Sequence, residues 1–470
     1  MRYLLVDIGS TFTKGSLVDT KEYRILAHGK AITTIETSVM EGIQEMLLDL
    51  VQDANQRGNH LEFTNGKCWD RALLCSSAAG GLKMVAVGLG RHLTAEAATR
   101  SALGAGARIL KTYALDLTDA DLAELEALQP DILLLSGGTD HGNRRSLVEH
   151  ARRLATLSHR MPIVIAGNCD VAEEAASLLS DFNVTITDNV MPQVNVLNAD
   201  PSRREIRRIF MERITHAKGL DEVGEKIGPV LTPTPDAVLQ AAKLLSLGTE
   251  NRPGMGDLLL VDIGGATTDI HSVGDGKPKQ PKITIDGKES ELRIEGLQEP
   301  LDKRTVEGDL GMRYSARSLY ESVGQEALAA IAPADYAKEC DARASHIRFI
   351  PQTPRDFAVD RAMARACAQV ALSRHVGTLR RDYEKGRYIY YLSGKDLTDF
   401  TTIIGTGGVL VHQDRPADIL CPEERVLFPH RPHLYLDQQY LLSAMGLLAT
   451  EEPDVAFDLL QRTLVDITKA

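Results

Sequence analysis

Two segments of this chain place a carboxylate, glycine and hydroxyl groups at spacings that suit phosphate chemistry. The first reads Asp-Ile-Gly-Ser-Thr-Phe-Thr-Lys from Asp7 to Lys14 and follows a short apolar run. Glycine lets the backbone approach a ligand closely, and successive amides can point at phosphate oxygens. Asp7 could orient the water shell of Mg²⁺. We expect a strand hairpin here, whose nucleotide contacts would come from Gly9, Ser10, Thr11, Thr13 and Lys14.

The second segment repeats this pattern about half a chain later. It reads Asp-Ile-Gly-Gly-Ala-Thr-Thr-Asp from Asp262 to Asp269 and again follows an apolar strand. One Asp-Ile-Gly turn is weak evidence of function, but two copies in equivalent positions favour a nucleotide site and a molecule of two duplicated lobes. The further contacts expected from this turn are Gly264, Gly265, Ala266, Thr267 and Thr268.

A third segment, Gly-Thr-Gly-Gly, follows a predicted strand at 401–404. Its glycines would let a flat base or a ribose lie against the backbone. Alone it is as compatible with an ordinary turn between a strand and a helix. Its place after the second hairpin predicts that the nucleoside is contacted by Gly405, Thr406, Gly407 and Gly408.

Composition excludes several classes of protein. Of 470 residues, 43% are hydrophobic and 25% charged, which excludes a disordered chain. The formal net charge of −12 argues against a nucleic-acid partner. No apolar run approaches the ~18 residues of a membrane span, so we expect a cytoplasmic protein without a membrane partner. Six cysteines without a C-x-x-C pair predict free thiols and give no support for a zinc site. The scattered His271, His375 and His412 show no metal-ligand spacing either.

The elements between the two hairpins should form a parallel sheet. Strands predicted at 131–136, 163–166 and 184–187 alternate with helices at 144–158 and 172–179. Thr118 and Asp121 resemble a capping box that opens an earlier helix. Further helices are expected at 312–322, 361–383 and 436–448. The small-residue turns at 75–81 and 136–143 could line the phosphate site or simply close a turn, and both alternatives stay open. Asp140 and Asp309 are expected to be structural carboxylates.

The order of first hairpin, helical region, second hairpin and late Gly-Gly turn resembles the actin, Hsp70 and sugar-kinase superfamily of ATPases. The resemblance implies an α/β, two-lobed actin/Hsp70-like ATPase with duplicated ribonuclease-H-like domains and a nucleotide cleft between them. The expected lobes are 1–232 and 233–470. ATP and Mg²⁺ would be the cofactors. Asp7 and Asp269 would hold the metal through water, and Asp262 would orient or deprotonate the attacking water.

A narrower resemblance covers nearly the whole chain. Seven motifs of the chain resemble those of the GlmL/MutL family, the accessory proteins of adenosylcobalamin-dependent glutamate mutase and related mutases. The motifs lie at 75–82, 136–143, 166–168, 188–192, 234–239, 307–315 and 374–377. The family implies an ATP-driven reactivating chaperone that uses lobe closure to exchange damaged cobalamin in a protein partner, the mutase. The mismatch-repair proteins of the same name carry D-x-G-x-G, and the segment at Asp262 lacks its last glycine.

Two other functions stay open at this stage. A small-molecule kinase could share the fold, although no motif indicates a base that would activate a phosphate acceptor. A non-catalytic scaffold that binds nucleotide is less favoured, because both hairpins keep their aspartates. The sequence does not reveal which mutase would be the partner.

Overall fold

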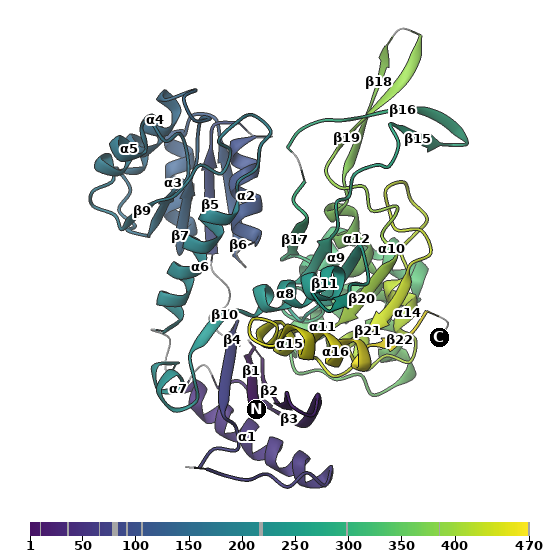
Figure 1. The fold of residues 1–470 in the computed structure, drawn as a ribbon. Coiled ribbons are helices and arrows are strands. Elements are labelled where there is room, and N and C mark those ends of the chain that lie inside the picture. The colour runs from purple at the N-terminus through teal and green to yellow at the C-terminus, as the bar shows by residue number, and fades with distance from the viewer. Residues whose placement is uncertain are drawn as a thin grey trace. The chain divides into compact units, whose positions relative to one another are not determined.

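The computed structural model describes residues 1–9, 11–34, 37–64, 66–77, 83–90, 93–104, 107–215, 220–297, 299–384 and 386–468. Contacts divide the chain into two compact units. Unit 1 comprises Met1–Gln240, Gly296–Gln298 and Ser443–Ala456, and unit 2 comprises Ala241–Glu295, Glu299–Leu442 and Phe457–Ala470. Helices and strands occur in both units, so the predicted α/β class is confirmed (Figure 1). Compact units and nucleotide-binding lobes need not coincide, so the expected lobes at 1–232 and 233–470 stay a prediction.

The first sheet of unit 1 begins with the predicted hairpin. Its strands lie in the order β3-β2-β1-β4-β10. The pairs β1–β2 and β2–β3 are antiparallel, whereas β1–β4 and β4–β10 are parallel. Their bounds are β1 Arg2–Ile8, β2 Phe12–Asp19, β3 Arg24–Ile32, β4 Arg71–Ser76 and β10 Val230–Pro233.

Helix α1 (Val39–Gln56) covers one face of this sheet. Ser38 caps it, since its side chain accepts a hydrogen bond from the amide of Met40. The helix lies close to β3 because Gly29 has no side chain. A Cβ at this position would lie 2.2 Å from the carbonyl oxygen of Met46. Helices α6 (Asp200–Thr215) and α7 (Leu220–Lys226) precede β10, and α8 (Thr234–Leu247) follows it.

A second, fully parallel sheet is inserted in unit 1. Its order is β6-β5-β7-β8-β9, and every neighbouring pair is parallel, as the alternation of strands and helices predicted. The strands are β5 Lys83–Gly88, β6 Arg108–Ala114, β7 Ile132–Leu135, β8 Ile163–Ile165 and β9 Val184–Ile186, and the helices between them are α2 Thr94–Gly104, α3 Asp119–Leu128, α4 Arg145–Leu154 and α5 Ala172–Leu178. The predicted capping box of Thr118 and Asp121 opens α3.

Both faces of the inserted sheet are covered. Leu133 and Leu135 pack with side chains of α3, α4 and α5, whereas Ile132 and Leu134 share a core with side chains of α2 and α6. Figure 1 shows these helices around the sheet. The inserted segment is therefore a doubly wound α/β sheet, a fold that binds ligands at the carboxyl ends of its strands.

The main sheet of unit 2 repeats the topology of the first sheet. Its order is β17-β14-β13-β20-β21-β22. The pairs β13–β14 and β14–β17 are antiparallel, and β13–β20 and β20–β21 are parallel. The bounds are β13 Leu258–Ile263, β14 Thr268–Val273, β17 Asp302–Glu307, β20 Thr402–Thr406, β21 His433–Leu436 and β22 Val465–Asp466. The first five strands match β3-β2-β1-β4-β10 in order and direction, so the predicted duplication of a ribonuclease-H-like sheet is confirmed.

The remaining elements complete the chain. The helices are α9 Ala316–Val323, α10 Gln325–Ile331, α11 Tyr336–Ser345, α12 Pro354–His375, α13 Gly408–Val411, α14 Pro416–Leu420, α15 Leu442–Leu448 and α16 Pro453–Thr463. Two small sheets consist of β11 Gly248–Thr249 with β12 Arg252–Pro253, and of β15 Lys282–Ile285, β16 Lys288–Ile294, β19 Arg387–Ser393 and β18 Thr378–Glu384.

Three predicted helices differ from the observed ones. The helix expected at 361–383 begins at Pro354 and ends at His375, because residues 378–384 form β18 and pair with β19. The helix expected at 436–448 is β21, a turn and then α15. The helix expected at 312–322 begins only at Ala316.

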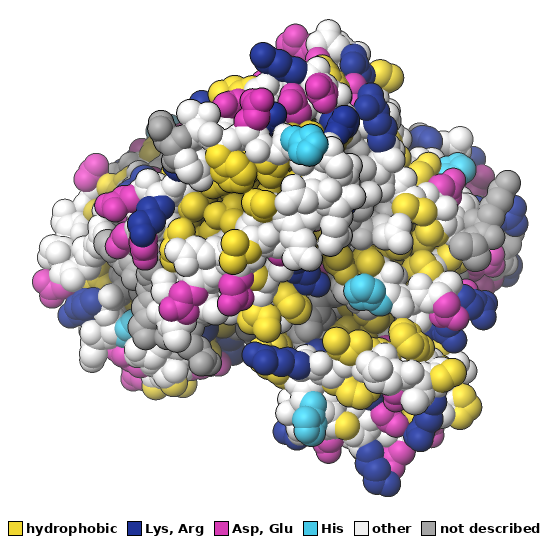
Figure 2. All heavy atoms as spheres, turned by 90° about the horizontal axis from the view of Figure 1, so that it is seen from below, with side chains coloured by type: hydrophobic (Ala, Val, Ile, Leu, Met, Phe, Trp, Pro, Cys, Tyr) yellow, Lys and Arg dark blue, Asp and Glu magenta, His cyan; other side chains and the backbone are white. Residues whose placement is uncertain are grey.

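Charged side chains of both signs are interspersed on the face shown in Figure 2. None of the helices in the described ranges combines the length and the hydropathy that crossing a bilayer would need.

Candidate functional site

The two Asp-Ile-Gly turns have the same geometry. Asp7 and Asp262 are each the next-to-last residue of the first strand of a sheet. The amide of Gly9 donates to the carbonyl of Phe12 at 3.1 Å, and the amide of Gly264 donates to the carbonyl of Thr267 at 2.9 Å. A Cβ on Gly9 would lie 2.6 Å from the oxygen of Phe12, so only glycine fits this turn without rearrangement.

Three donors within unit 1 converge on the carboxylate of Asp7, which is 9% exposed. Thr234 donates its hydroxyl to Oδ1 at 2.7 Å, and Ser443 donates its hydroxyl to Oδ2 at 3.1 Å. The thiol of Cys75 lies 3.6 Å from Oδ1. Burial and the charge of Asp7 raise the pKa of this thiol well above its usual value, so Cys75 stays protonated and can donate.

Two lysines share a sheet face with Asp7. Lys14 lies directly opposite Asp7 across β1 and β2, and Lys30 lies opposite Lys14 across β2 and β3. Side chains directly opposite each other in antiparallel strands project to the same face. Burial and the charge of Lys14 lower the pKa of Lys30. The sequence reading found Lys14 and missed Lys30, because the pairing of β2 with β3 brings the second lysine to the site.

The other predicted residues of the first turn differ in exposure. Ser10 lies outside the described residues. Thr11 is exposed, and its carbonyl accepts a hydrogen bond from the amide of Thr33. Thr13 is fully buried, and its hydroxyl bonds the hydroxyl of Thr33 at 3.0 Å. Thr13 therefore supports the strands below the turn, whereas Thr11 lies at its surface.

The second turn places two aspartates side by side. Asp262 lies directly opposite Asp269 across β13 and β14. Arg304 donates from Nε and Nη2 to Oδ1 of Asp269 at 2.9 and 2.6 Å, and Thr267 donates to Oδ2 at 3.0 Å. A metal bound directly to Oδ1 would compete with the guanidinium for the same oxygen. The donor set therefore fits a hydrated Mg²⁺ reached through water better than direct coordination.

A loop that follows β17 supports this turn. The carbonyls of Gly264 and Gly265 accept hydrogen bonds from the amides of Met312 and Arg313, at 3.0 and 2.8 Å. The carbonyl of Ala266 accepts one from the hydroxyl of Ser315 at 2.6 Å. Thr268 is fully buried and donates to the carbonyl of Leu310 at 2.7 Å. The motif at 307–315 thus fixes the turn's shape.

The segment Gly405–Gly408 lies beside the second turn. Thr406 is next to Asp262 across the parallel pair of β20 and β13. Gly407 has φ +113°, and a Cβ there would lie 2.3 Å from the carbonyl oxygen of Ile263. This position therefore requires glycine. Gly408 is the first residue of α13. The structure brings the predicted nucleoside contacts to the same end of the sheet as Asp262.

Sequence reasoning missed two residues at this end of the sheet. Asp437, 2% exposed, accepts hydrogen bonds from the amides of Leu441 and Leu442 at 2.9 and 3.1 Å. Thr406 donates its hydroxyl to the same carboxylate at 3.3 Å. Burial and the charges of Asp437 and Asp262 raise the pKa of Tyr440 to about 12. Asp437 follows β21 directly. A strand predicted to end at residue 436 would have pointed to Asp437 as a candidate site residue.

Other residues singled out in the sequence have structural partners. Arg374 holds Asp309 in an ion pair and lowers the pKa of Asp309 to about 2. His375 is fully buried between the hydroxyls of Ser272 and Thr305. The turn at 136–143 lies at the carboxyl end of β7 in the inserted sheet, and the turn at 75–81 extends beyond the described residues.

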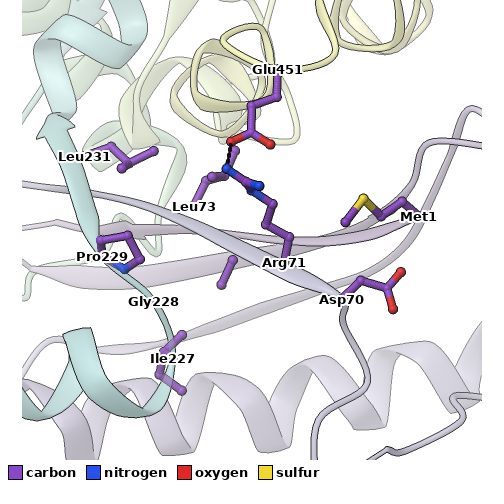
Figure 3. A pocket seen from close by; sticks show the side chains of 10 residues that line it. Met1, Asp70, Arg71, Leu73, Ile227, Gly228, Pro229, Leu231 and Glu451 are labelled. Carbon is purple, nitrogen blue, oxygen red and sulfur yellow. Dashed lines mark ion pairs between the residues drawn. The ribbon is translucent and has the colours of Figure 1, made fainter.

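A cavity of about 380 Å³ lies elsewhere in unit 1. It is lined at the start of β1 and β4 by Met1, Asp70 and Arg71, whereas Asp7 lies near the other end of β1. Arg71 points at Glu451, with which it forms an ion pair (Figure 3). The cavity is therefore separate from the Asp-Ile-Gly turn at Asp7.

If the first turn holds ATP for hydrolysis, as the sequence predicts, replacing Thr234 with Val should lower the rate about ten- to a hundredfold, because a hydrogen bond to a charged group contributes about 1.5–3 kcal/mol. Thr234→Ser keeps the donor and should restore most of the rate. Phosphate release from Mg-ATP measures both. Thr156→Val, which removes an exposed hydroxyl that donates to the carbonyl of Arg153, is the control and should leave the rate unchanged. Equal rates for Thr234→Val and Thr156→Val would exclude this role.

Comparisons with known proteins agree with the sequence motifs. The family described as "MutL protein" matches residues 3–464. "Protein MutL" of Clostridium tetanomorphum is 44% identical over 476 residues, which cover 99% of each chain. Among solved structures, the activator of the 2-hydroxyisocaproyl-CoA dehydratase from Clostridium difficile with bound ADPNP covers 98% of each chain at 10% identity, with a TM-score of 0.33. A glycerol dehydratase reactivase covers 96% of this chain and 99% of its own at 10% identity, with a TM-score of 0.34. These two scores are low, whereas the sequence match spans nearly the whole chain: the chain belongs to the MutL family, of the GlmL type and not of the mismatch-repair type.

Proposed function

We propose that this chain is an ATP-dependent reactivating chaperone of the cytoplasm, whose protein partner is an adenosylcobalamin-dependent amino-acid mutase. The observation that carries the ATPase part is the repeated sheet, in which the same strand order ends twice in an Asp-Ile-Gly turn. Membership of the MutL family supports the partner class. ATP hydrolysis and lobe closure would promote the exchange of damaged cobalamin.

The residues have separate proposed roles in hydrolysis. Asp262 orients or deprotonates the attacking water. Asp7 and Asp269 are the carboxylates that would each hold Mg²⁺ through water. When bound, Mg²⁺ would neutralise charge on the phosphate oxygens. Positioned amides and cations stabilise charge that develops on the transferred phosphoryl group. In unit 1 these cations are Lys14 and the neighbouring Lys30.

The test combines ATP hydrolysis with rescue of a mutase. The purified chain is mixed with Mg-ATP and no acceptor, with or without a mutase whose cobalamin has lost its adenosyl group. We expect slow phosphate release that the inactivated mutase stimulates, and return of mutase activity when intact cofactor is added. A non-hydrolysable ATP analogue and the Asp262→Asn variant should support neither.

Each part of the proposal can fail separately. Phosphate release without any return of mutase activity, tested with several amino-acid mutases, would contradict the chaperone role and leave an ATPase. Phosphate transfer that occurs only when a small-molecule acceptor is present would instead favour a kinase.

A further inference from the structure

Three metal-ligating side chains meet at the carboxyl edge of the inserted sheet, on two loops. His141 lies in the loop after β7, and Cys169 and Asp170 lie in the loop after β8. Nδ1 of His141 is 3.0 Å from Oδ1 of Asp170, and Sγ of Cys169 is 3.9 Å from the same oxygen. The three ligand atoms all lie within 4.8 Å of one another. These residues lie outside the two Asp-Ile-Gly turns.

The distances are close to those of a tetrahedral metal site. Zinc binds sulfur at about 2.3 Å and nitrogen or oxygen at about 2.0–2.2 Å, which puts neighbouring ligand atoms roughly 3.3–3.7 Å apart. The nitrogen-to-oxygen and sulfur-to-oxygen distances of 3.0 and 3.9 Å bracket that range. The third distance, between Sγ of Cys169 and Nδ1 of His141, is at most 4.8 Å, so rotations of the exposed Cys169 and His141 side chains toward Asp170 would bring all three atoms to one ion.

Buried asparagines lock the two loops together. Asn168 is fully buried and donates from Nδ2 to the carbonyl of Thr139 at 2.6 Å. Asn189, 2% exposed, donates from Nδ2 to Oδ1 of Asp140 at 2.9 Å, and that oxygen also accepts the amide of Cys169 at 3.0 Å. The backbone that carries the three ligands is thus fixed before any ion binds, which reduces the entropy lost on binding.

The local backbone is shaped to present His141. His141 has φ +60°, in the left-handed region that few residues other than glycine adopt. Gly138 has φ +69°, and a Cβ there would lie 2.0 Å from the carbonyl oxygen of Asn143. The loop therefore turns tightly and directs the imidazole toward Asp170, as their hydrogen bond shows.

The ligand types favour Zn²⁺ over Mg²⁺ and Ca²⁺. Thiolate and imidazole suit Zn²⁺, whereas Mg²⁺ and Ca²⁺ prefer oxygen ligands alone. Arg144 pairs with Oδ2 of Asp170 at 2.9 Å, which orients the carboxylate so that Oδ1 remains on the side of the other two ligands. Such outer partners commonly fix metal ligands in place.

We propose that His141, Cys169 and Asp170 bind one Zn²⁺ ion, with a fourth position open to water or to a ligand with a free lone pair. As the Zn–S bond forms, the thiol of Cys169 releases its proton to solvent. The proton that His141 Nδ1 holds in its hydrogen bond to Asp170 Oδ1 moves through solvent to Nε2, so Nδ1 and Oδ1 can supply the other two lone pairs. Three protein ligands and one open position are typical of sites that exchange a bound ligand. The location at the strand carboxyl ends of a doubly wound sheet is where such folds bind ligands.

Metal titration of the untagged protein tests this site. The chain is stripped with chelator, kept reduced and titrated with Zn²⁺ by calorimetry, and with Co²⁺ by absorption spectroscopy. We expect one equivalent of Zn²⁺ and a thiolate-to-cobalt charge-transfer band. Cys169→Ser should abolish the band and weaken Zn²⁺ binding about tenfold or more. His141→Ala should also weaken binding, and excess Mg²⁺ should not compete.

The matched control is Cys421→Ser, which removes the other exposed free cysteine. It should keep both the band and the affinity. All these side chains are exposed, so circular dichroism and the urea unfolding midpoint should match the wild type in every variant. Unchanged Zn²⁺ affinity in Cys169→Ser, no binding by the wild type, or loss of the band in Cys421→Ser would overturn the proposal.

Discussion

Replacing Asp262 with Asn is expected to lower the rate of ATP hydrolysis about 10²-fold or more, while ATP affinity changes no more than several-fold. Asn has the same shape but cannot accept a proton, and positioned acid–base groups contribute about 10²- to 10⁴-fold. The charge of Asp262 acts at this end of the sheet, since it contributes to the raised pKa of Tyr440. Phosphate release under saturating Mg-ATP measures the rate, and equilibrium titration with labelled ATP measures the affinity.

Asp275→Asn is the matched control for this prediction. Asp275 is exposed, pairs with Lys277 and follows the end of β14 that lies away from the turn. Its substitution should leave both quantities unchanged. A rate for Asp262→Asn within about threefold of this control would remove Asp262 from the catalytic role, because that difference is far below the 10²-fold expected for an acid–base group.

Replacing Asp360 with Ala is expected to lower the free energy of unfolding by about 3–5 kcal/mol, the cost of breaking a buried ion pair from one side. Asp360 on α12 is 1% exposed. It accepts Nε of Arg343 at 2.6 Å and Nη2 of Arg313 at 2.9 Å. Arg343 is also 1% exposed, so the variant would remove the buried partner of a buried guanidinium, which would keep its ion pair with Glu339 at 2.7 Å. Urea unfolding, followed by circular dichroism, gives the difference.

Asp341→Ala supplies the comparison for the buried pair. Asp341 pairs with Arg317 at 2.6 Å, but both side chains are at least 60% exposed. Exposed pairs contribute about 0–1 kcal/mol, so this variant should unfold almost like the wild type. If Asp360→Ala and Asp341→Ala lowered the free energy of unfolding by similar amounts, the buried ion pair would not stabilise the fold more than the exposed one.

The hairpins could be predicted because their signals are local. A buried strand, an aspartate and a glycine turn lie within a few residues, and both turns form as expected around Asp7 and Asp262. The partners of Asp7 could not be predicted in the same way. Thr234 and Ser443 lie 227 and 436 residues away along the chain, and only tertiary packing brings them to the carboxylate.

The wrong helix boundary at 361–383 has a similar cause. Helical periodicity holds to His375, but the pairing of β18 with β19 determines the conformation of the residues that follow. Gly377, two residues past the helix, was an available stop signal. The proposed zinc ligands show the same limit, since spacing rules do not detect ligands supplied by two separate loops.

The path of the chain has a consequence for biosynthesis. Residues 443–456 return to unit 1, and Ser443 completes the surroundings of Asp7. A ribosome adds about 5–20 residues per second, so this serine emerges tens of seconds after the aspartate that it contacts. A nascent chain can form the first hairpin early, but it acquires the full set of hydroxyl partners of Asp7 only when translation has passed residue 443. Chains that end before residue 443 can therefore form the first turn, but Asp7 in them lacks the hydrogen bond from Ser443.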